Sequence, residues 1–306
     1  MLSDNKKVVF LTGATGYIGS QLTKRLVTEG HEVHILTRPL SSLSMLHEVE
    51  KHISVHCYDG TYQSIENAIS SVRPDIVFHL AAYAKLTYEP SEIEGLIKSN
   101  ILLGTHLVEA MTKNKVTNLV NTSSFSQHYQ QEVYLPNSLY AATKQAFEDI
   151  LRYYTTFANL KVVSLTLFDN YGPDDPRPKL MNLLYKAAIN QTELKMSPGE
   201  QLLDLLYIDD VINAYVIAGN RLLEERNLSV FEKFQVRSNR PLKLKQIVQL
   251  FEEISAFKLL IHWGGINYRE GEIMIPWQGE EILPNWKPYF SLKEGLKRFL
   301  LLIRKN

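Results

Sequence analysis

The sequence has a single cysteine among its 306 residues, Cys57, so it can form no disulfide bond within the chain. No group of Cys and His residues has the spacing of a zinc site, and we expect no bound metal ion. Neither sign of charge predominates, because 33 Lys and Arg residues balance 33 Asp and Glu residues. This balance argues against a nucleic-acid-binding protein, which usually carries a net basic field. An anionic ligand would therefore have to be held by locally placed cations or backbone N–H groups.

Long apolar runs are also absent. No segment is apolar over the length that spans a bilayer. Residues 1–7 lead directly into a strand pattern and contain no apolar signal-peptide core. We therefore expect a reduced, cytoplasmic protein without a membrane partner, in which Cys57 is a small buried side chain at the end of a strand.

Short apolar runs alternate with helical patterns through the first half of the sequence. Residues 8–11 form a continuously apolar run, which is typical of a parallel strand buried on both faces. The helix that follows has its apolar residues on one face and ends at Gly30. The same alternation predicts strands at 33–36, 54–58, 76–80, 119–122 and 162–167, and helices at 65–72, 93–112 and 140–154. We therefore predict an α/β fold with a doubly wound parallel (Rossmann) sheet, since each parallel crossover needs a helix.

The pattern changes in the Pro-rich stretch 170–178, where we place a domain boundary. Residues 1–170 are expected to form the dinucleotide-binding domain, with a return segment near 202–236. Residues 171–306 are expected to form mainly a smaller, mixed α/β substrate-binding domain.

Three glycines, Gly13, Gly16 and Gly19, follow the first strand directly and precede the first helix. One glycine allows the tight turn, one lets backbone N–H groups approach a pyrophosphate, and one lets the helix pack on the strand. The helix start adds its positive dipole end. The alternative is a glycine-rich turn without a ligand, but strand, turn and helix occur in the required order. The predicted cofactor-binding residues here are Gly13, Thr15, Gly16, Tyr17, Ile18 and Gly19.

The end of the second strand contacts the adenosine ribose in this kind of fold. An acidic residue there favours NAD, whereas an Arg pairs with the 2′-phosphate of NADP. The sequence has Arg38 at this place and no acid until Glu48, which favours NADP(H) over NAD(H). The alternative for Arg38 is an ordinary surface residue at a strand exit. Asp59, after the third strand, is placed to accept from the adenine amino group.

Further motifs carry a family resemblance. They are residues 12–19, 75–82, Asn100 before 104–105, 122–124, 140–144, 171–173, 207–211 and 269–272, which together cover most of the chain in order. With them the sequence resembles the extended short-chain dehydrogenase/reductases, a family of nucleotide-sugar epimerases, dehydratases and reductases. The resemblance implies a nucleotide-diphosphate sugar as substrate, and homodimerisation through the helices near 93–112 and 140–157. It also implies that Leu80, Ala81, Ala82 and Asn100 lie beside the cofactor.

Tyr140 and Lys144 lie four residues apart on a predicted helix and therefore on one face. A phenol has an ordinary pKa near 10, which a neighbouring ammonium lowers towards the range useful for a general acid or base. Lys144 is also placed to hold the nicotinamide ribose. Ser124 would donate to the same substrate oxygen. When the fifth strand is aligned with that of the family without gaps, Ser124 takes the place of the catalytic hydroxyl residue, and Ser123 remains the alternative.

Departures from the family narrow the reaction. Dehydratases carry an Asp-Glu pair after the strand-five hydroxyl residue, whereas residues 125–128 hold no carboxylate here, so we do not expect dehydration. Segments 167–179 and 197–201 resemble 4-ketoreductases of 6-deoxy and dideoxy sugars, such as CDP-abequose and CDP-paratose synthases. The predicted substrate-binding residues are Ser124, His128, Asn170, Arg177, Lys179 and Arg269. For His128 the alternative is an ordinary loop residue, and for both arginines it is a surface ion pair.

Three hypotheses follow for the function. The first is NADPH-dependent reduction of the 4-keto group of a CDP- or dTDP-activated deoxysugar, with Tyr140 as proton donor, Ser124 orienting the carbonyl and Lys144 tuning Tyr140. The second is a 4-epimerase that uses the same residues and returns the hydride, against which Arg38 argues because an unconsumed cofactor is usually NAD. The third is a silent NADP-binding sensor or scaffold, which an intact catalytic set disfavours.

Overall fold

The computed structural model describes residues 2, 6–224 and 230–303. Its centre is a sheet of seven parallel strands in the order β11-β6-β5-β4-β1-β2-β3. These strands are β1 (Val8–Thr12), β2 (Glu32–Thr37), β3 (Ile53–Cys57), β4 (Ile76–His79), β5 (Asn118–Ser124), β6 (Lys161–Leu167) and β11 (Phe231–Val236). The predicted doubly wound Rossmann sheet is confirmed.

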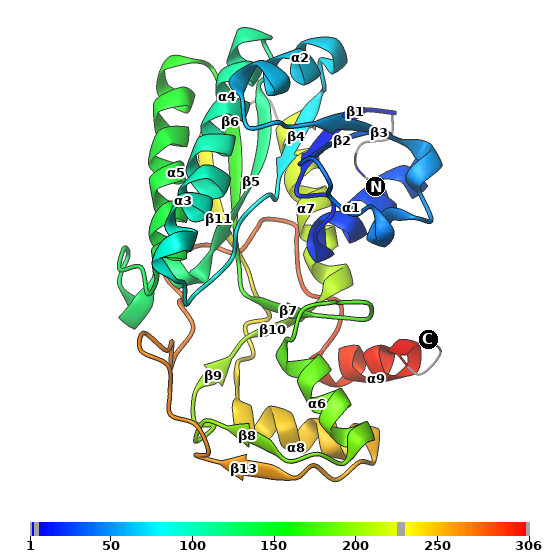
Figure 1. Cartoon of the computed structure of the whole chain (residues 1–306), viewed down its shortest axis with the longest axis vertical. Coiled ribbons are helices and arrows are strands. Elements are labelled where there is room, and N and C mark those ends of the chain that lie inside the picture. Colours follow the sequence, from blue (N-terminus) through cyan, green and yellow to red (C-terminus); the bar gives the residue numbers. More distant parts are fainter. Residues whose placement is uncertain (1, 3–5, 225–229, 304–306) are drawn as a thin grey trace.

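Helices cover both faces of the sheet (Figure 1). They are α1 (Tyr17–Thr28), α2 (Tyr62–Val72), α3 (Ile93–Ile97), α4 (Leu103–Lys113), α5 (Leu139–Phe157) and α7 (Ile208–Glu224). Because side chains alternate along a strand, β1 sends Leu11 to the core under α1 and α7 and Phe10 to the core under α2, α4 and α5. Two separate apolar cores therefore hold the sheet rigid from both sides.

The strand order reverses beside β1. After β3 the chain crosses β2 and β1 to reach β4, so β1 has β2 on one side and β4 on the other. At such a switch point the connections leave in opposite directions, and a crevice opens beyond the carboxyl ends of the strands. The glycine turn after β1 and the residues after β4 border this crevice.

A smaller part lies beyond the carboxyl edge of the sheet (Figure 1). It contains α6 (Leu180–Asn190), α8 (Leu244–Ser255) and α9 (Leu292–Ile303). Its strands pair two by two: β7 (Asp169–Tyr171) with β10 (Leu205–Tyr207), β9 (Leu202–Leu203) with β12 (Leu242–Lys243), and β8 (Leu194–Met196) with β13 (Ile261–Trp263). The chain returns to the large sheet through α7 and β11, and β11 pairs with β6 along its whole length.

The return segment near 202–236 begins with two separate strands: β9 ends before Asp204 and β10 begins after it, and the Asp204 carboxylate accepts a hydrogen bond from the Ser238 amide. The expectation that Cys57 is buried is wrong. Cys57 is exposed, because β3 is the edge strand of the sheet and its outer side has no neighbour. No helix in the described part of the chain is both long and apolar enough to cross a membrane.

Candidate active site

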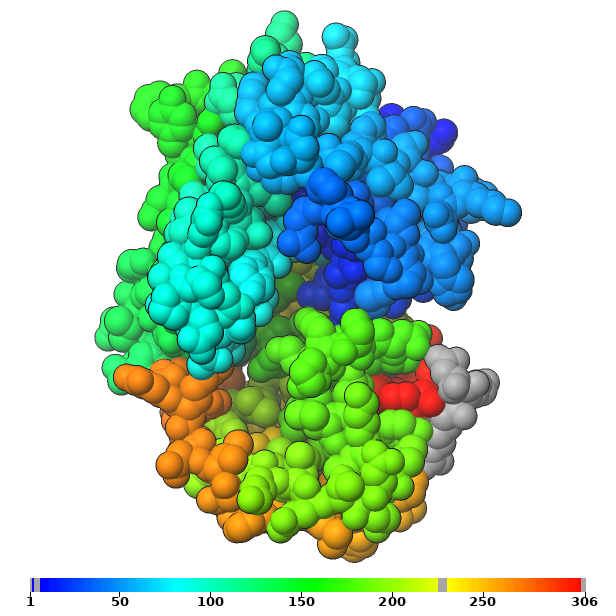
Figure 2. All heavy atoms as spheres, in the orientation of Figure 1, coloured from blue at the N-terminus to red at the C-terminus, as the bar shows by residue number. Residues whose placement is uncertain are grey.

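A large cavity opens between the sheet domain and the smaller part. It has a volume of about 410 Å³ and extends from the glycine turn after β1 to Arg269 and Glu272. Figure 2 shows the corresponding hollow between the blue-to-cyan first third of the chain and the green and orange segments. A second cavity of about 330 Å³ continues over the carboxyl ends of β1 and β2. Because Gly13, Gly16 and Leu80 line both, the two cavities form one continuous groove.

The glycine turn is shaped for close approach. Gly13 has φ +76°, and a Cβ there would lie 2.5 Å from the Ala81 nitrogen. A Cβ on Gly19 would lie 2.1 Å from the Gly13 oxygen. Gly16 begins α1 without a side-chain cap, so the first N–H groups of the helix remain available to an anion. The turn therefore fits the pyrophosphate of a dinucleotide, and any side chain at Gly13 or Gly19 would displace the backbone that forms it.

Most predicted cofactor residues border the groove. The lining of one or both cavities includes Gly13, Thr15, Gly16, Tyr17, Ile18, Gly19, Arg38, Leu80, Ala81 and Ala82. Ser41, Tyr58 and Ser99 also line the second cavity, and sequence reasoning missed all three. Tyr58 directly precedes Asp59, and Ser99 directly precedes Asn100, both of which were predicted. Including the preceding residue at each place would have found them.

Two predicted cofactor residues lie outside this lining. Asp59 does not face the groove, because its carboxylate accepts from the amide (2.9 Å) and the hydroxyl (2.7 Å) of Thr61. Asn100 is buried and its amide is fully used: it accepts from the Tyr83 amide (2.7 Å) and donates to the Tyr83 carbonyl and the Thr143 hydroxyl. Direct contact of these two residues with the cofactor stays a prediction. Asn100 instead fixes the segment after β4 to α5.

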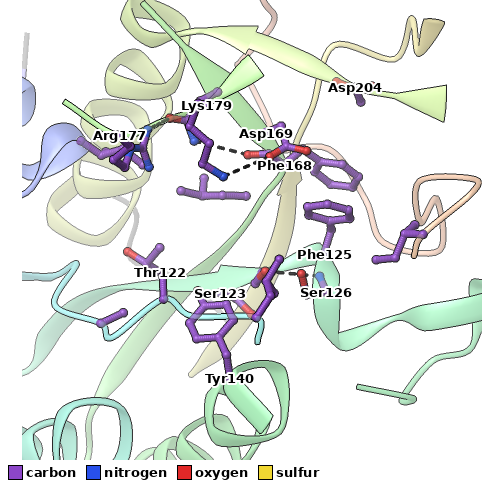
Figure 3. A pocket seen from close by; sticks show the side chains of 18 of the residues that line it. Thr122, Ser123, Phe125, Ser126, Tyr140, Phe168, Asp169, Arg177, Lys179 and Asp204 are labelled. Carbon is purple, nitrogen blue, oxygen red and sulfur yellow. Dashed lines mark hydrogen bonds and ion pairs between the residues drawn. The ribbon is translucent and has the colours of Figure 1, made fainter. Parts of the chain in front are cut away.

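Tyr140, Ser123 and Ser124 line the sheet side of the large cavity. Figure 3 shows Tyr140 and Ser123 there. Ser138 caps the start of α5 by accepting from the Ala141 amide, which orients the first turn that carries Tyr140. Ser124 ends β5, and its hydroxyl interacts with Tyr140 and lowers the pKa of that phenol. The Ser123 hydroxyl is instead bonded to Gln127 Oε1 at 2.5 Å. Of the two serines, Ser124 is the one that acts on the phenol.

The electrostatics of this pair differ from expectation. Burial raises the pKa of Tyr140 to about 12, and the Ser124 hydroxyl opposes this only in part. Burial lowers the pKa of Lys144 to about 8, against the negative charge of Glu148, which raises it. Lys144 is 2% exposed and does not line the cavities. The expected lowering of the Tyr140 pKa by a neighbouring ammonium is therefore wrong in this structure, because desolvation of the phenol is the largest effect and raises the pKa.

Four predicted substrate residues line the opposite side of the large cavity: Asn170, Arg177, Lys179 and Arg269. Arg177 is committed to its neighbours, because its guanidinium makes a double hydrogen bond to Asp175 and a further one to Asn170. It also lies over the Tyr17 ring, 5.0 Å from the centroid. Lys179 and Arg269 face carboxylates at the longer distances of 3.7 and 3.8 Å.

His128 does not line the large cavity, and its predicted contact with substrate stays a prediction. Its imidazole is 3% exposed and stacks on Trp277 with ring centroids 4.7 Å apart. One ring nitrogen faces the Val133 carbonyl at 2.7 Å and the other lies 3.3 Å from Glu280. The short turn after β5 directs this side chain away from the groove and under the segment 271–283.

Sequence reasoning missed an apolar part of the cavity wall. Phe125 and Phe168 line the cavity beside Ser124 and stack on each other, with centroids 4.9 Å apart (Figure 3). Phe168 is buried, yet it belongs to neither of the two apolar cores. The sequence could have indicated both residues, because each Phe directly follows the end of a parallel strand, and ligands bind at these ends in such sheets.

Comparisons with known proteins agree with this geometry. Residues 9–230 match the model of the NAD dependent epimerase/dehydratase family. CDP-abequose synthase of Salmonella muenchen is 26% identical over 303 residues, covering 98% of this chain and 99% of that protein. CDP-abequose synthase of Yersinia pseudotuberculosis is 28% identical over 297 residues, covering 95% and 97%.

Solved structures share the fold. UDP-glucose 4-epimerase from Thermotoga maritima, crystallised with UDP-glucose, superposes with a TM-score of 0.84 at 24% identity and covers 97% of this chain and 98% of that one. UDP-glucuronic acid 4-epimerase from Bacillus cereus, in complex with a substrate analogue and NAD, has the same score at 22% identity, with 97% and 99% covered. Since the family model matches most of the chain, the protein belongs to the NAD dependent epimerase/dehydratase family of extended short-chain dehydrogenase/reductases, and it is a nicotinamide-cofactor enzyme of the oxidoreductase or epimerase kind.

Proposed function

We propose that the protein reduces the 4-keto group of a CDP- or dTDP-activated 6-deoxy or 3,6-dideoxy hexose, with NADPH as the reductant. The observation that carries the proposal is that Tyr140 and Ser124 line the same cavity as the glycine turn on one side and Arg269 on the other. A ketone at Tyr140 would thus lie between a cofactor site and a cation that suits a diphosphate. The relatives named CDP-abequose synthase, matched over nearly their whole length, support a nucleotide sugar as substrate.

The roles of the side chains follow from their protonation states. The cofactor would supply a hydride to the carbonyl carbon. Tyr140 would donate its phenol proton to the carbonyl oxygen, which yields the alcohol, while Ser124 hydrogen-bonds to the same oxygen. With its pKa raised to about 12 by burial, Tyr140 holds its proton at neutral pH, which suits a general acid. Lys144 would place a positive charge near the buried side of the Tyr140 phenol. It would also hold the nicotinamide ribose.

The choice of NADPH is supported at the far end of the groove. Thr37, Arg38 and Ser41 line the second cavity together. Arg38 is exposed and has no acidic partner among residues 6–224 and 230–303, so its guanidinium is available to a phosphate. Two hydroxyls beside one guanidinium suit a 2′-phosphate better than a 2′-hydroxyl.

The stacked pair of Phe125 and Phe168 supports a sugar with few hydroxyl groups. An apolar wall cannot satisfy a buried hydroxyl, whereas it packs well against a methyl or methylene carbon. The two rings lie beside Ser124, so they would face the carbons next to the ketone. This placement favours deoxygenated positions adjacent to C4.

We also expect a homodimer. Tyr153 and Phe157 on the outer side of α5 are 59% and 76% exposed, and the adjacent α3 exposes Ile93 and Ile97. Exposed apolar side chains on α3 and α5 are of the kind that a second copy of the chain would cover. Light scattering after gel filtration would detect the dimer, and Phe157→Lys is expected to shift it towards the monomer.

The experiment that tests the reaction is a panel of CDP-, dTDP-, GDP- and UDP-4-keto-6-deoxyhexoses, followed by NADPH absorbance and by NMR of the product. The proposal predicts one NADPH oxidised for each sugar reduced. A 4-epimerase would interconvert the 4-hydroxyl epimers without net oxidation of the cofactor. Turnover of that kind, or no turnover with any member of the panel, would reject the reductase assignment.

A further inference from the structure

A row of polar side chains crosses the α5 side of the sheet, where an apolar surface is the ordinary choice. Strand pairing aligns Asn121 with Ser164 and Lys233, and in the next layer Ser123 with Thr166 and Gln235. These positions lie on the same face as Leu119 and Val162 of the apolar core beneath α5. Burying polar groups is costly unless each one has a hydrogen-bond partner, so this row requires partners from α5, which packs over this face.

Glu148 on α5 supplies the central partner. It is 2% exposed, and its two carboxylate oxygens accept from three different elements. Ser164 donates to Oε1 at 3.0 Å, and Lys233 donates to Oε2 at 2.9 Å. Gln127 donates to Oε2 at 3.2 Å, and the same Gln127 accepts from the Ser123 hydroxyl and the Ser124 amide. Glu148 therefore joins the turn that carries Ser124 to the two strands behind it.

Lys233 extends the network to the segment 271–283, which we name the C-terminal strap. The ammonium of Lys233 lies 3.1 Å from one carboxylate oxygen of Glu280, and Thr166 donates to the other oxygen at 2.7 Å. The neighbouring Trp277 of the strap stacks on His128. Glu272, Ile273 and Pro276 of the same strap line the large cavity. The partly buried Lys233 thus binds both Glu148 on α5 and Glu280 of the C-terminal strap.

Lys144 lies four residues before Glu148 on α5, so the two side chains share one helix face. Both are 2% exposed. The charged or titratable groups around Lys144 are Tyr140 and Glu148 on its own helix and His79 on β4. Of these, Glu148 is the carboxyl group, and it raises the pKa of Lys144 against the effect of burial.

We infer that Glu148, Lys233 and Glu280 are positioning residues that link the protonation of Lys144 to the placement of the C-terminal strap over the substrate. The inference rests on the proposed function only in the role it assigns to Lys144 and to the strap. Glu148 is bonded to Lys233, and it acts on Lys144, four residues away on the same helix, through its charge. A weaker hold by Lys233 leaves more of that charge to Lys144, and it also loosens Glu280.

The linkage predicts opposite effects from two substitutions. Glu148→Gln keeps the shape of the side chain and removes its charge, so the proton affinity of Lys144 should fall about tenfold. Lys233→Gln removes the competing cation, so the proton affinity of Lys144 should rise. The matched control is Glu232→Gln: Glu232 is the neighbour of Lys233 on β11, points to the opposite face, and pairs with Arg221 at 2.6 Å. It should leave Lys144 unchanged.

The measurement is an NMR titration of protein labelled at the lysine Cε, with the Lys144 signal assigned through Lys144→Arg. It requires no turnover, so it reads the linkage even if the proposed reaction is wrong, and the sugar panel tests that reaction separately. Shifts of opposite sign for Glu148→Gln and Lys233→Gln are expected. Unchanged Lys144 titration in both folded variants, shifts of the same sign, or an equal shift in the control would overturn the inference. If Glu148→Gln does not fold, Lys233→Gln alone decides the sign.

The strap provides a second readout. Glu280→Gln weakens the hold of Lys233 and Thr166 on the strap, so the KM for the sugar should rise several-fold while kcat changes little. A merely structural role would lower the melting temperature without separating KM from kcat. A proportional loss of kcat at unchanged KM would contradict the assignment of Glu280.

Discussion

The ring of Phe125 lies nearly parallel to that of Phe168, with the two planes 15° apart and the centroids at 4.9 Å. One ring follows β5 and the other follows β6, so the stack bridges the ends of two adjacent parallel strands. Offset aromatic stacking of this kind favours a fixed wall over two independently mobile rings. The wall borders the place where the ketone would lie.

Replacing Phe125 by Ala should therefore change sugar selectivity. We expect kcat/KM for a 4-keto-6-deoxy sugar to fall roughly tenfold, since one face of apolar packing is lost. Sugars with an additional hydroxyl should lose less, because water can then reach that group. Steady-state rates with both sugars measure the ratio, and an unchanged NADPH affinity is the control. Equal losses for both sugars would show that the wall does not select.

Tyr140→Phe removes the proposed proton donor and keeps the ring. Turnover should drop by about 10²–10⁴-fold, the usual contribution of a general acid. Binding of NADPH, followed by fluorescence titration, should stay within about twofold of wild type. If the variant retains most of its turnover, then another group protonates the product oxygen.

Arg38→Ala tests the cofactor preference. A hydrogen-bonded charge pair contributes about 1.5–3 kcal/mol, which corresponds to roughly 10–100-fold in affinity. The affinity for NADPH should fall by this factor, whereas the affinity for NADH, which lacks the 2′-phosphate, should change little. Parallel titrations with both cofactors measure the difference. Similar losses for both would assign Arg38 to the surface and not to the cofactor.

Arg177 and Arg269 should behave differently from each other. Arg177 is tied to Asp175 and packs on Tyr17, so Arg177→Ala should lower the melting temperature by several degrees. Arg269 is held more loosely, with its nearest carboxylate at 3.8 Å. Arg269→Ala should leave the melting temperature unchanged and raise the KM for the nucleotide sugar at least tenfold. Thermal unfolding and steady-state rates together distinguish the two roles, and a reversed pattern would exchange them.

The pH dependence should report on Lys144. Burial lowers the pKa of Lys144 to about 8, so the side chain is charged below that pH and neutral above it. With Tyr140 protonated throughout, since burial raises the pKa of its phenol to about 12, activity should decline above pH 8. Lys144→Arg retains its charge and should move this decline to higher pH. An identical alkaline limb in both proteins would assign the decline to a different group.

The sheet and the glycine turn were predictable from the sequence because each depends on local signals. Buried parallel strands appear as continuous apolar runs, and Gly13 and Gly19 occupy positions where a Cβ has no room. Tyr140 and Lys144 could be paired because helix periodicity alone places them on one face. The same local reasoning could not anticipate their pKa values, which depend on burial by elements far away in the chain.

His128 and Asn100 show where sequence reasoning ends. Both carry polar groups suited to a ligand, yet distant partners satisfy them: Trp277 and Glu280 for His128, and Thr143 for Asn100. Whether a loop histidine faces a groove or a buried carboxylate is decided by the tertiary fold. Arg177 differs, because its charge is taken up by Asp175, only two positions away in the chain.

The edge strand β11 has a consequence for how the protein is made. Glu148 meets its cation Lys233 85 residues later in the chain, so during synthesis the carboxylate is made well before the lysine that it binds. Pairing across such sequence separation is slow compared with local contacts. The amino-terminal half can form its strands and helices as it leaves the ribosome. The hydrogen-bond network around Glu148 can form completely only after β11, which ends at residue 236, has emerged.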